Sequence, residues 1–121
     1  MDILKLIEEI KDWKGSALLY SGRPDPEWEI EDVPAVNLVK YWASLPKLNY
    51  SFETSSALGY KGCCLISDNN LKWYAYKEVV CLYVNDEALE SRKDSNRIFE
   101  ISLISTAPAG VIPSTFVDNE F

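Results

Sequence analysis

Residues 60–84 read YKGCCLISDNNLKWYAYKEVVCLYV, and this stretch decides the fold. Its first part, up to residue 67, ends in a run that is apolar on both faces, which is typical of a central strand. Residues 68–70 are Asp-Asn-Asn, which is typical of a turn. Residues 72–84 are rich in aromatic and β-branched side chains, which predicts one long strand or two strands broken near 77–78. We therefore expect 60–67 and 72–84 to form an antiparallel hairpin.

Around this hairpin the sequence predicts three helices. Apolar residues recur at helical spacing in 2–13, and Gly15 is a suitable stop after them. A second helix is expected from about 33 to 45, with Pro34 in its first turn, where a missing N–H costs little. A third helix is expected from 94 or 95 to about 106. It is apolar around much of its girth, so it should be well buried.

Two further segments are expected to be extended. Residues 16–21 include a short apolar run that predicts a strand. After it, acidic residues alternate with apolar ones up to residue 31. Because residues two apart in an extended chain share a face, Trp28 and Ile30 should pack on the core, and a row of carboxylates should cover the other side.

The fold class that follows is α+β, as one domain over residues 1–121. We expect a mostly antiparallel sheet of three to five strands with the three helices packed on it. A chain of 121 residues is long enough to bury one hydrophobic core. The polar segments 46–56 and 85–93 are expected to be a connecting loop and a surface segment with at most one helical turn.

Composition excludes several classes of function. The formal net charge is −7 and the pI is about 4.5, which argues against nucleic acid or an anionic membrane as the main partner. No apolar run is long enough to span a bilayer, and the first residues lack the features of a signal peptide, so we expect a cytoplasmic protein.

Histidine is absent, which removes His-based triads, His–Cys dyads and His-ligated metals. The three cysteines are an odd number in apolar surroundings and are expected to be buried thiols. We therefore predict no catalytic residue, no metal ligand and no cofactor.

Residues 23–32 hold more than half of the chain's net charge, because one arginine stands against five acids. Three interpretations stay open. The segment is a solvated acidic face with Arg23 paired to Asp25 or Glu27, or it is a docking surface for a basic partner. The third interpretation is a site for a hard cation such as Ca²⁺ or Mg²⁺, although the spacing of an EF-hand is absent.

Three short motifs give the chain a resemblance. They are SGRPDPEW at Ser21–Trp28, LGYKG at Leu58–Gly62, and D-x-x-R-x-F-E at Asp94–Glu100. The chain resembles a family of small bacterial proteins that carry SGRP-D/N-P-x-W, LGY-R/K-G and D-x-x-R-x-L/F-E segments. The resemblance spans most of the chain, with Phe99 in place of an aliphatic residue in the third motif. It implies a grouping and no activity.

The motifs suggest a single polar and aromatic cluster. Its expected members are Arg23, Asp25, Trp28, Tyr60, Lys61, Arg97 and Glu100. In one interpretation the cluster is a structural network in which the helical pair Arg97–Glu100 anchors the stiff 21–28 loop. In the other it is a recognition site for a small anion or a peptide.

The function predicted from the sequence is a non-enzymatic, acidic binding or interaction module of the cytosol. An inhibitor or immunity-type protein directed at a basic partner is one form of it, because complementary charge directs encounter. The alternative is a small-ligand-binding protein or an enzyme that uses Arg23, Asp25, Tyr60 and Arg97. The sequence predicts no oligomeric state.

Overall fold

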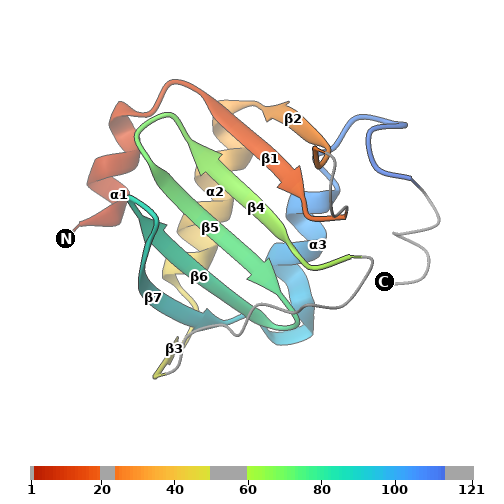
Figure 1. Cartoon of the computed structure of the whole chain (residues 1–121). Coiled ribbons are helices and arrows are strands. Elements are labelled where there is room, and N and C mark those ends of the chain that lie inside the picture. Colours follow the sequence, from red (N-terminus) through yellow and green to blue (C-terminus); the bar gives the residue numbers. More distant parts are fainter. Residues whose placement is uncertain (1, 20–23, 50–59, 114–121) are drawn as a thin grey trace.

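The computed structural model describes residues 2–19, 24–49 and 60–113. Within these ranges the chain forms one antiparallel sheet in the order β2-β1-β4-β5-β6-β7-β3, with α2 and α3 behind one face (Figure 1). The strands are β1 (Trp13–Ala17), β2 (Glu27–Ile30), β3 (Lys47–Leu48), β4 (Cys63–Ser67), β5 (Leu71–Tyr76), β6 (Val79–Val84) and β7 (Glu87–Lys93). The helices are α1 (Ile3–Leu6), α2 (Asp32–Ala43) and α3 (Ile98–Ile104), with 3₁₀ turns η1 (Ile7–Glu9) and η2 (Ser95–Arg97).

The expected hairpin is confirmed as the pair β4 and β5, which runs from Cys63 opposite Ala75 to Ile66 opposite Lys72. Of the two alternatives for 72–84, the broken strand is correct. The break lies at Lys77 and Glu78, which both have positive φ, at 44° and 67°. Two consecutive residues with positive φ make the tight turn whose twist suits a two-residue hairpin.

Three tryptophans form the centre of the core. Trp73 of β5 lies 5.9 Å from Trp13 and 6.3 Å from Trp42 between ring centroids. Trp42 belongs to α2, and its indole N–H donates to the carbonyl of Val80 at 3.0 Å. Trp13 donates to the Asp32 carboxylate at 3.2 Å. These contacts fix α2 against the middle of the sheet.

Trp13 also corrects the first predicted helix. The helix over 2–13 was predicted too long, because α1 ends at Leu6 and Trp13 begins β1. Trp13 pairs with Ile30 on one side and with Ser67 on the other, so sheet pairing overrides the helical spacing of its side chain.

The α+β class is confirmed, but three to five strands is too few, since the sheet of the described residues has seven. The two missed strands are β3 and β7, in segments expected to be a loop and a polar surface. β7 follows β6 through a turn at Asn85 and Asp86, both with positive φ. As a near-edge strand β7 is partly solvated, so it carries charged residues and lacks the apolar pattern on which strand prediction depends.

Arg92 of β7 ties this edge to the end of α2. One of its terminal nitrogens donates to the carbonyls of Ala43 and Leu45 at 2.8 and 2.7 Å. Its guanidinium lies 4.7 Å from the centroid of the Trp42 ring. The last carbonyls of a helix have no partner within the helix, so Arg92 supplies one for the C-terminus of α2.

The same arginine forms an ion pair that should make stability depend on pH. Burial acts to raise the pKa of Glu90, but contacts with Lys47 at 3.1 Å and Arg92 at 2.9 Å outweigh it and hold that pKa below its ordinary value. A carboxyl with a lowered folded-state pKa stabilises the protein above its unfolded-state pKa, and the stabilisation is lost as pH falls through the folded-state pKa.

We therefore expect Glu90→Gln to lower the melting temperature at pH 7 by about 3–6 °C, which corresponds to about 1 kcal/mol for a domain of this size. At about pH 3, below the ordinary pKa of a glutamate, the difference from the parent should be smaller, because this stabilisation is lost as the pH falls through the folded-state pKa of Glu90. Thermal melts followed by circular dichroism at the two pH values measure it. An equal difference at both values would assign Glu90 a packing role instead.

Gly62, just before β4, occupies a position that only glycine suits. Its φ is +110°, and a Cβ would lie 2.4 Å from Cε1 of Tyr74 and 2.6 Å from the carbonyl oxygen of Ala75. Backbone strain and a steric clash therefore act together.

The two contributions can be separated by comparison with Gly110, which has a φ of +86° but no atom within 4 Å of a built Cβ. We expect Gly62→Ala to cost about 2–4 kcal/mol of unfolding free energy, and Gly110→Ala about 1 kcal/mol from backbone strain alone. Urea denaturation of both variants measures the difference. Equal losses would mean that Tyr74 moves aside at little cost.

Candidate functional site

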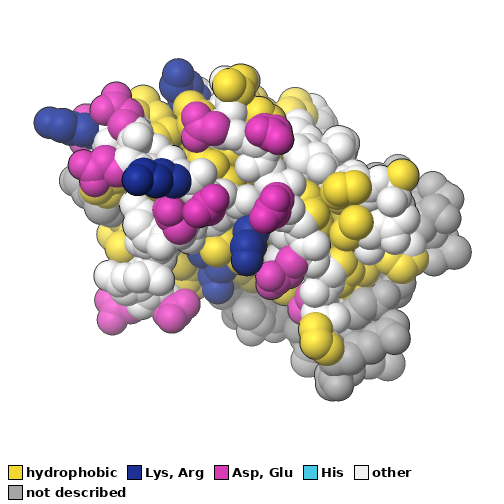
Figure 2. Space-filling model, turned by 90° about the horizontal axis from the view of Figure 1, so that it is seen from above, with side chains coloured by type: hydrophobic (Ala, Val, Ile, Leu, Met, Phe, Trp, Pro, Cys, Tyr) yellow, Lys and Arg dark blue, Asp and Glu magenta, His cyan; other side chains and the backbone are white. Residues whose placement is uncertain are grey.

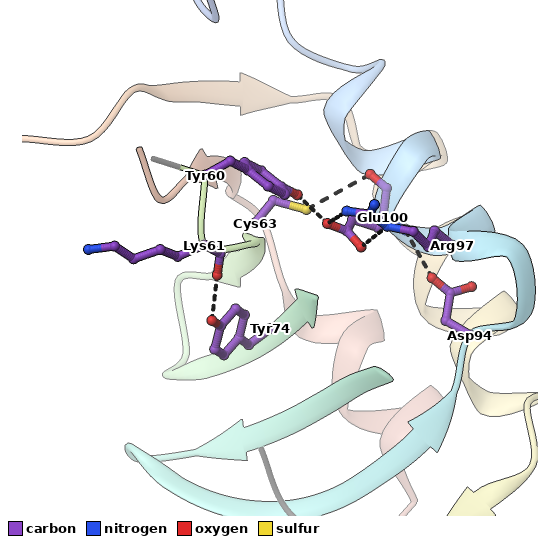
Figure 3. A network of polar contacts seen from close by, with 7 residues as sticks. All are labelled: Tyr60, Lys61, Cys63, Tyr74, Asp94, Arg97 and Glu100. Atoms are coloured by element: carbon purple, nitrogen blue, oxygen red, sulfur yellow. Dashed lines mark hydrogen bonds and ion pairs between the residues drawn. The ribbon is translucent and has the colours of Figure 1, made fainter. Parts of the chain in front are cut away.

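The carboxylate of Glu100 is the centre of the polar cluster. Glu100 lies in the first turn of α3 and is fully buried. Arg97 donates to one carboxylate oxygen through Nε at 2.9 Å and to the other through Nη2 at 2.8 Å. The Tyr60 hydroxyl donates to that second oxygen (Figure 3). A buried carboxylate needs such partners, because an unpaired charge in the interior is very costly.

The chain positions this pair through an unusual start of α3. Asn96 and Arg97 have positive φ, at 62° and 58°, and they form the end of η2 directly before α3. The buried Asp94 carboxylate accepts from the backbone N–H groups of Phe99 at 2.9 Å and Glu100 at 3.2 Å. These N–H groups have no partner within the helix, so the Asp94 side chain caps the N-terminus of α3, although Asp94 itself lies three residues before Arg97 in the sequence.

The third motif thus has a physical explanation in this chain. Asp94 caps α3, Arg97 pairs with Glu100, and Phe99 is fully buried in the core. Burial raises the pKa of Asp94, although its hydrogen bonds from Phe99 and Glu100 act in the opposite direction.

The segment 60–62 brings Tyr60 to the cluster. Burial, and then the neighbouring Cys63 and Glu100, raise the pKa of Tyr60, so its phenol stays protonated and donates. The thiol of Cys63 lies 3.8 Å from the backbone oxygen of Glu100, and burial raises the pKa of that thiol as well. Tyr60 and Cys63 therefore hold the start of α3 against the start of β4.

Lys61 takes part through its backbone. Its N–H donates to Leu18 at 2.8 Å, and its carbonyl accepts from the Tyr74 hydroxyl at 2.5 Å. Its side chain extends away from Glu100 (Figure 3). Leu18 also donates to Gly62 at 2.9 Å, so two residues oppose one and the strand pairing contains a bulge.

The first motif contributes structural contacts. Asp25 accepts from the backbone N–H of Leu19 at 2.8 Å. Trp28 is buried on β2, where its ring lies against Gly15 and its N–H donates to the Thr106 hydroxyl at 2.8 Å. Arg23 lies outside the described residues.

The structure therefore brings together three of the seven expected residues by their side chains, namely Tyr60, Arg97 and Glu100. Two participants were missing from the expected set. Asp94 is the first residue of the third motif, and that place was the signal for it. Cys63 gave none, because a thiol in an apolar run is typical of any buried strand.

The chemistry of this cluster is directed inward. Both carboxylate oxygens of Glu100 accept from Tyr60 or Arg97. Five surface clefts of the described chain are lined by other residues. This arrangement favours the structural interpretation of the cluster over a recognition site.

The acids of residues 25–32 lie at a different place. Along β2 the burial alternates as expected, with Trp28 and Ile30 buried and Glu27 and Glu29 exposed. Beside the N-terminal end of β1 is an open cleft of about 720 Å³. Its charged lining residues are Lys11, Asp12, Lys14, Glu29, Glu31, Asp32 and Asp68.

This cleft carries an excess of negative charge, and Figure 2 shows Asp and Glu side chains on this side of the molecule with Lys or Arg side chains among them. Within the described ranges, Glu29, Glu31 and Asp68 take part in no ion pair. Among all residues that the structure describes, no group of three or more Asp, Glu or Cys side chains is arranged to hold a metal ion. The cation interpretation of the acidic segment therefore has no support there.

Comparison of the chain with protein-family models, with curated proteins and with solved structures found no match. In the part of the chain that the structure describes, no helix is both long and apolar enough to cross a membrane.

Substitutions should show that removal of the buried charge of Glu100 costs more unfolding free energy than removal of an exposed charge. We expect Glu100→Gln to cost about 2–4 kcal/mol of unfolding free energy, because Arg97 then loses its charged partner, and Tyr60→Phe to cost about 1–2 kcal/mol. Glu87→Gln, at an exposed position of β7, is the matched control and should change stability by less than about 0.5 kcal/mol.

Chemical denaturation of the three variants gives these values. If Glu100→Gln were as mild as Glu87→Gln, the Glu100 carboxylate would not hold the fold together. The cluster would then have to be reconsidered as a binding site.

Proposed function

We propose that this protein is a non-enzymatic, acidic binding module, and that the cleft beside β1 and β2 receives a basic segment of a partner protein. The observation that carries the proposal is the cleft itself, whose lining has five carboxylates and two lysines. None of those five carboxylates takes part in an ion pair within the described ranges.

The electrostatics of the cleft determine how such binding should behave. A single exposed ion pair contributes only about 0–1 kcal/mol, so useful affinity requires several pairs formed together. Exposed charges are also screened over about 10 Å at 0.1 M salt. Binding at this cleft should therefore fall steeply as salt is added, and complementary charge should mainly raise the association rate.

An inhibitor or immunity-type protein that covers a cationic site of its target is the class that we favour, acting in the cytosol. The rival function, ligand binding or catalysis by Tyr60, Arg97 and their expected neighbours, has less support. In that cluster the polar groups of Tyr60 and Arg97 are already used to hold a fully buried carboxylate.

Two variants of equal net charge test the proposal, with a penta-lysine peptide as the probe. The cleft variant combines Glu29→Gln, Glu31→Gln and Asp68→Asn. The control combines Glu8→Gln, Asp86→Asn and Glu87→Gln, which are exposed positions outside the cleft lining.

We expect the cleft variant to bind the peptide about tenfold more weakly than the parent, since it loses roughly three pairs of about 0.5 kcal/mol each. The control should stay within about twofold, and 0.5 M salt should abolish the difference. Calorimetric titration measures each affinity. Equal weakening of both variants would show attraction to net charge and no binding site.

A further inference from the structure

The outer edge of β2 offers unpaired backbone groups next to the acidic cleft. β2 is the terminal strand of the sheet and pairs only with β1 among the described strands. An edge strand has N–H and C=O groups that no neighbour satisfies, which makes it a template for another strand.

The register identifies the outward groups. The N–H of Ala17 donates to the carbonyl of Pro26 at 3.2 Å, so the backbone of Pro26 faces β1. In an antiparallel pair the inward and outward positions alternate. Trp28 lies opposite Gly15, so its backbone N–H and C=O groups also face β1. The backbone N–H and C=O groups of Glu27 and Glu29 therefore point outward, away from β1. In the described chain, no hydrogen bond reaches those groups.

The side chains at these outward positions are charged. Glu27 and Glu29 are both exposed and lie on the sheet face opposite to buried Trp28 and Ile30. Side chains directly opposite each other on adjacent strands lie about 5 Å apart, and opposite charges stabilise such pairs. An added strand would therefore be favoured if it placed Lys or Arg opposite each glutamate.

We propose that the outer edge of β2, which pairs with no other described strand, accepts an extended basic segment of a partner protein as an added strand. The segment alternates Lys or Arg with apolar residues. Its backbone bonds to Glu27 and Glu29, and its cations lie beside their carboxylates. This mode of recognition obtains affinity from main-chain hydrogen bonds and specificity from alternate side chains. The inference rests on the proposed function for the basic character of the partner, and it adds how that partner binds.

The opposite edge of the sheet, at β7 and β3, is less suited to accept a basic strand. There β3 already pairs with Ser91 and Arg92 of β7. The carboxylate of Glu90, beside them, is engaged with Lys47 and Arg92. Charge complementarity to a basic strand is therefore available at β2 and is largely consumed at β7.

Two peptides of equal charge test the inference. One is acetyl-Lys-Val-Lys-Val-Lys-amide, and the other carries a methyl group on the backbone nitrogen of each lysine. The backbone groups of Glu27 and Glu29 point outward, so a peptide residue opposite either of them exchanges backbone hydrogen bonds with it. A lysine that is methylated on its backbone nitrogen has no N–H to donate, so the methylated peptide cannot form these bonds. Both peptides are titrated into the full-length, ¹⁵N-labelled protein, and amide shifts and exchange rates are recorded.

We expect the unmethylated peptide to bind at least about tenfold more tightly, since two hydrogen bonds contribute about 1 kcal/mol each. At saturation, exchange of the Glu27 and Glu29 amides should slow about tenfold, whereas those of Trp28 and Ile30 should barely change.

Equal affinity of the two peptides would overturn strand addition and leave the acidic binding module standing. Failure of both peptides to bind would overturn both proposals. Protection of β7 amides in place of β2 amides would also overturn the inference.

Discussion

Burial of the Glu100 carboxylate is the constraint on which the second and third motifs depend. A charge without solvent must be paired, and the chain supplies Arg97 from a left-handed backbone position and Tyr60 from the approach to β4. Asp94 then satisfies the first N–H groups of α3. Because α3 carries Phe99 and Leu103 into the core, this polar arrangement decides how the helix lies on the sheet.

Local patterns predicted the parts of the fold that depend on local physics. The hairpin of β4 and β5 follows from an apolar run, a turn and an aromatic run, each a property of adjacent residues. The alternation along β2 correctly placed Trp28 and Ile30 inside, because the strand has one buried face. The motifs also brought Tyr60, Arg97 and Glu100 into one set, and the structure joins them.

The remaining features depend on contacts between residues distant in sequence. Trp28 was grouped with the polar cluster, but its indole bonds to Thr106, 78 positions along the chain. Trp13 fits a helical stripe by spacing, yet pairing on both sides makes it a strand residue. Arg92 lies in a polar stretch that resembles solvated surface, and only the folded chain shows that it caps α2. Neither propensity nor periodicity contains information of this kind.

A binding surface can be located by asking which hydrogen-bond donors and acceptors already have partners within the described chain and which do not. Around Glu100 the donors and acceptors meet each other inside the protein, so a ligand there would have to displace bonds that already hold α3 in place. At β2 the outward backbone of Glu27 and Glu29 has no partner among the described residues, and their carboxylates are exposed. A partner that binds at β2 would break no hydrogen bond among the described residues. This difference among the described residues is the physical reason for which we propose the acidic edge, and not the motif cluster, as the surface that a partner binds.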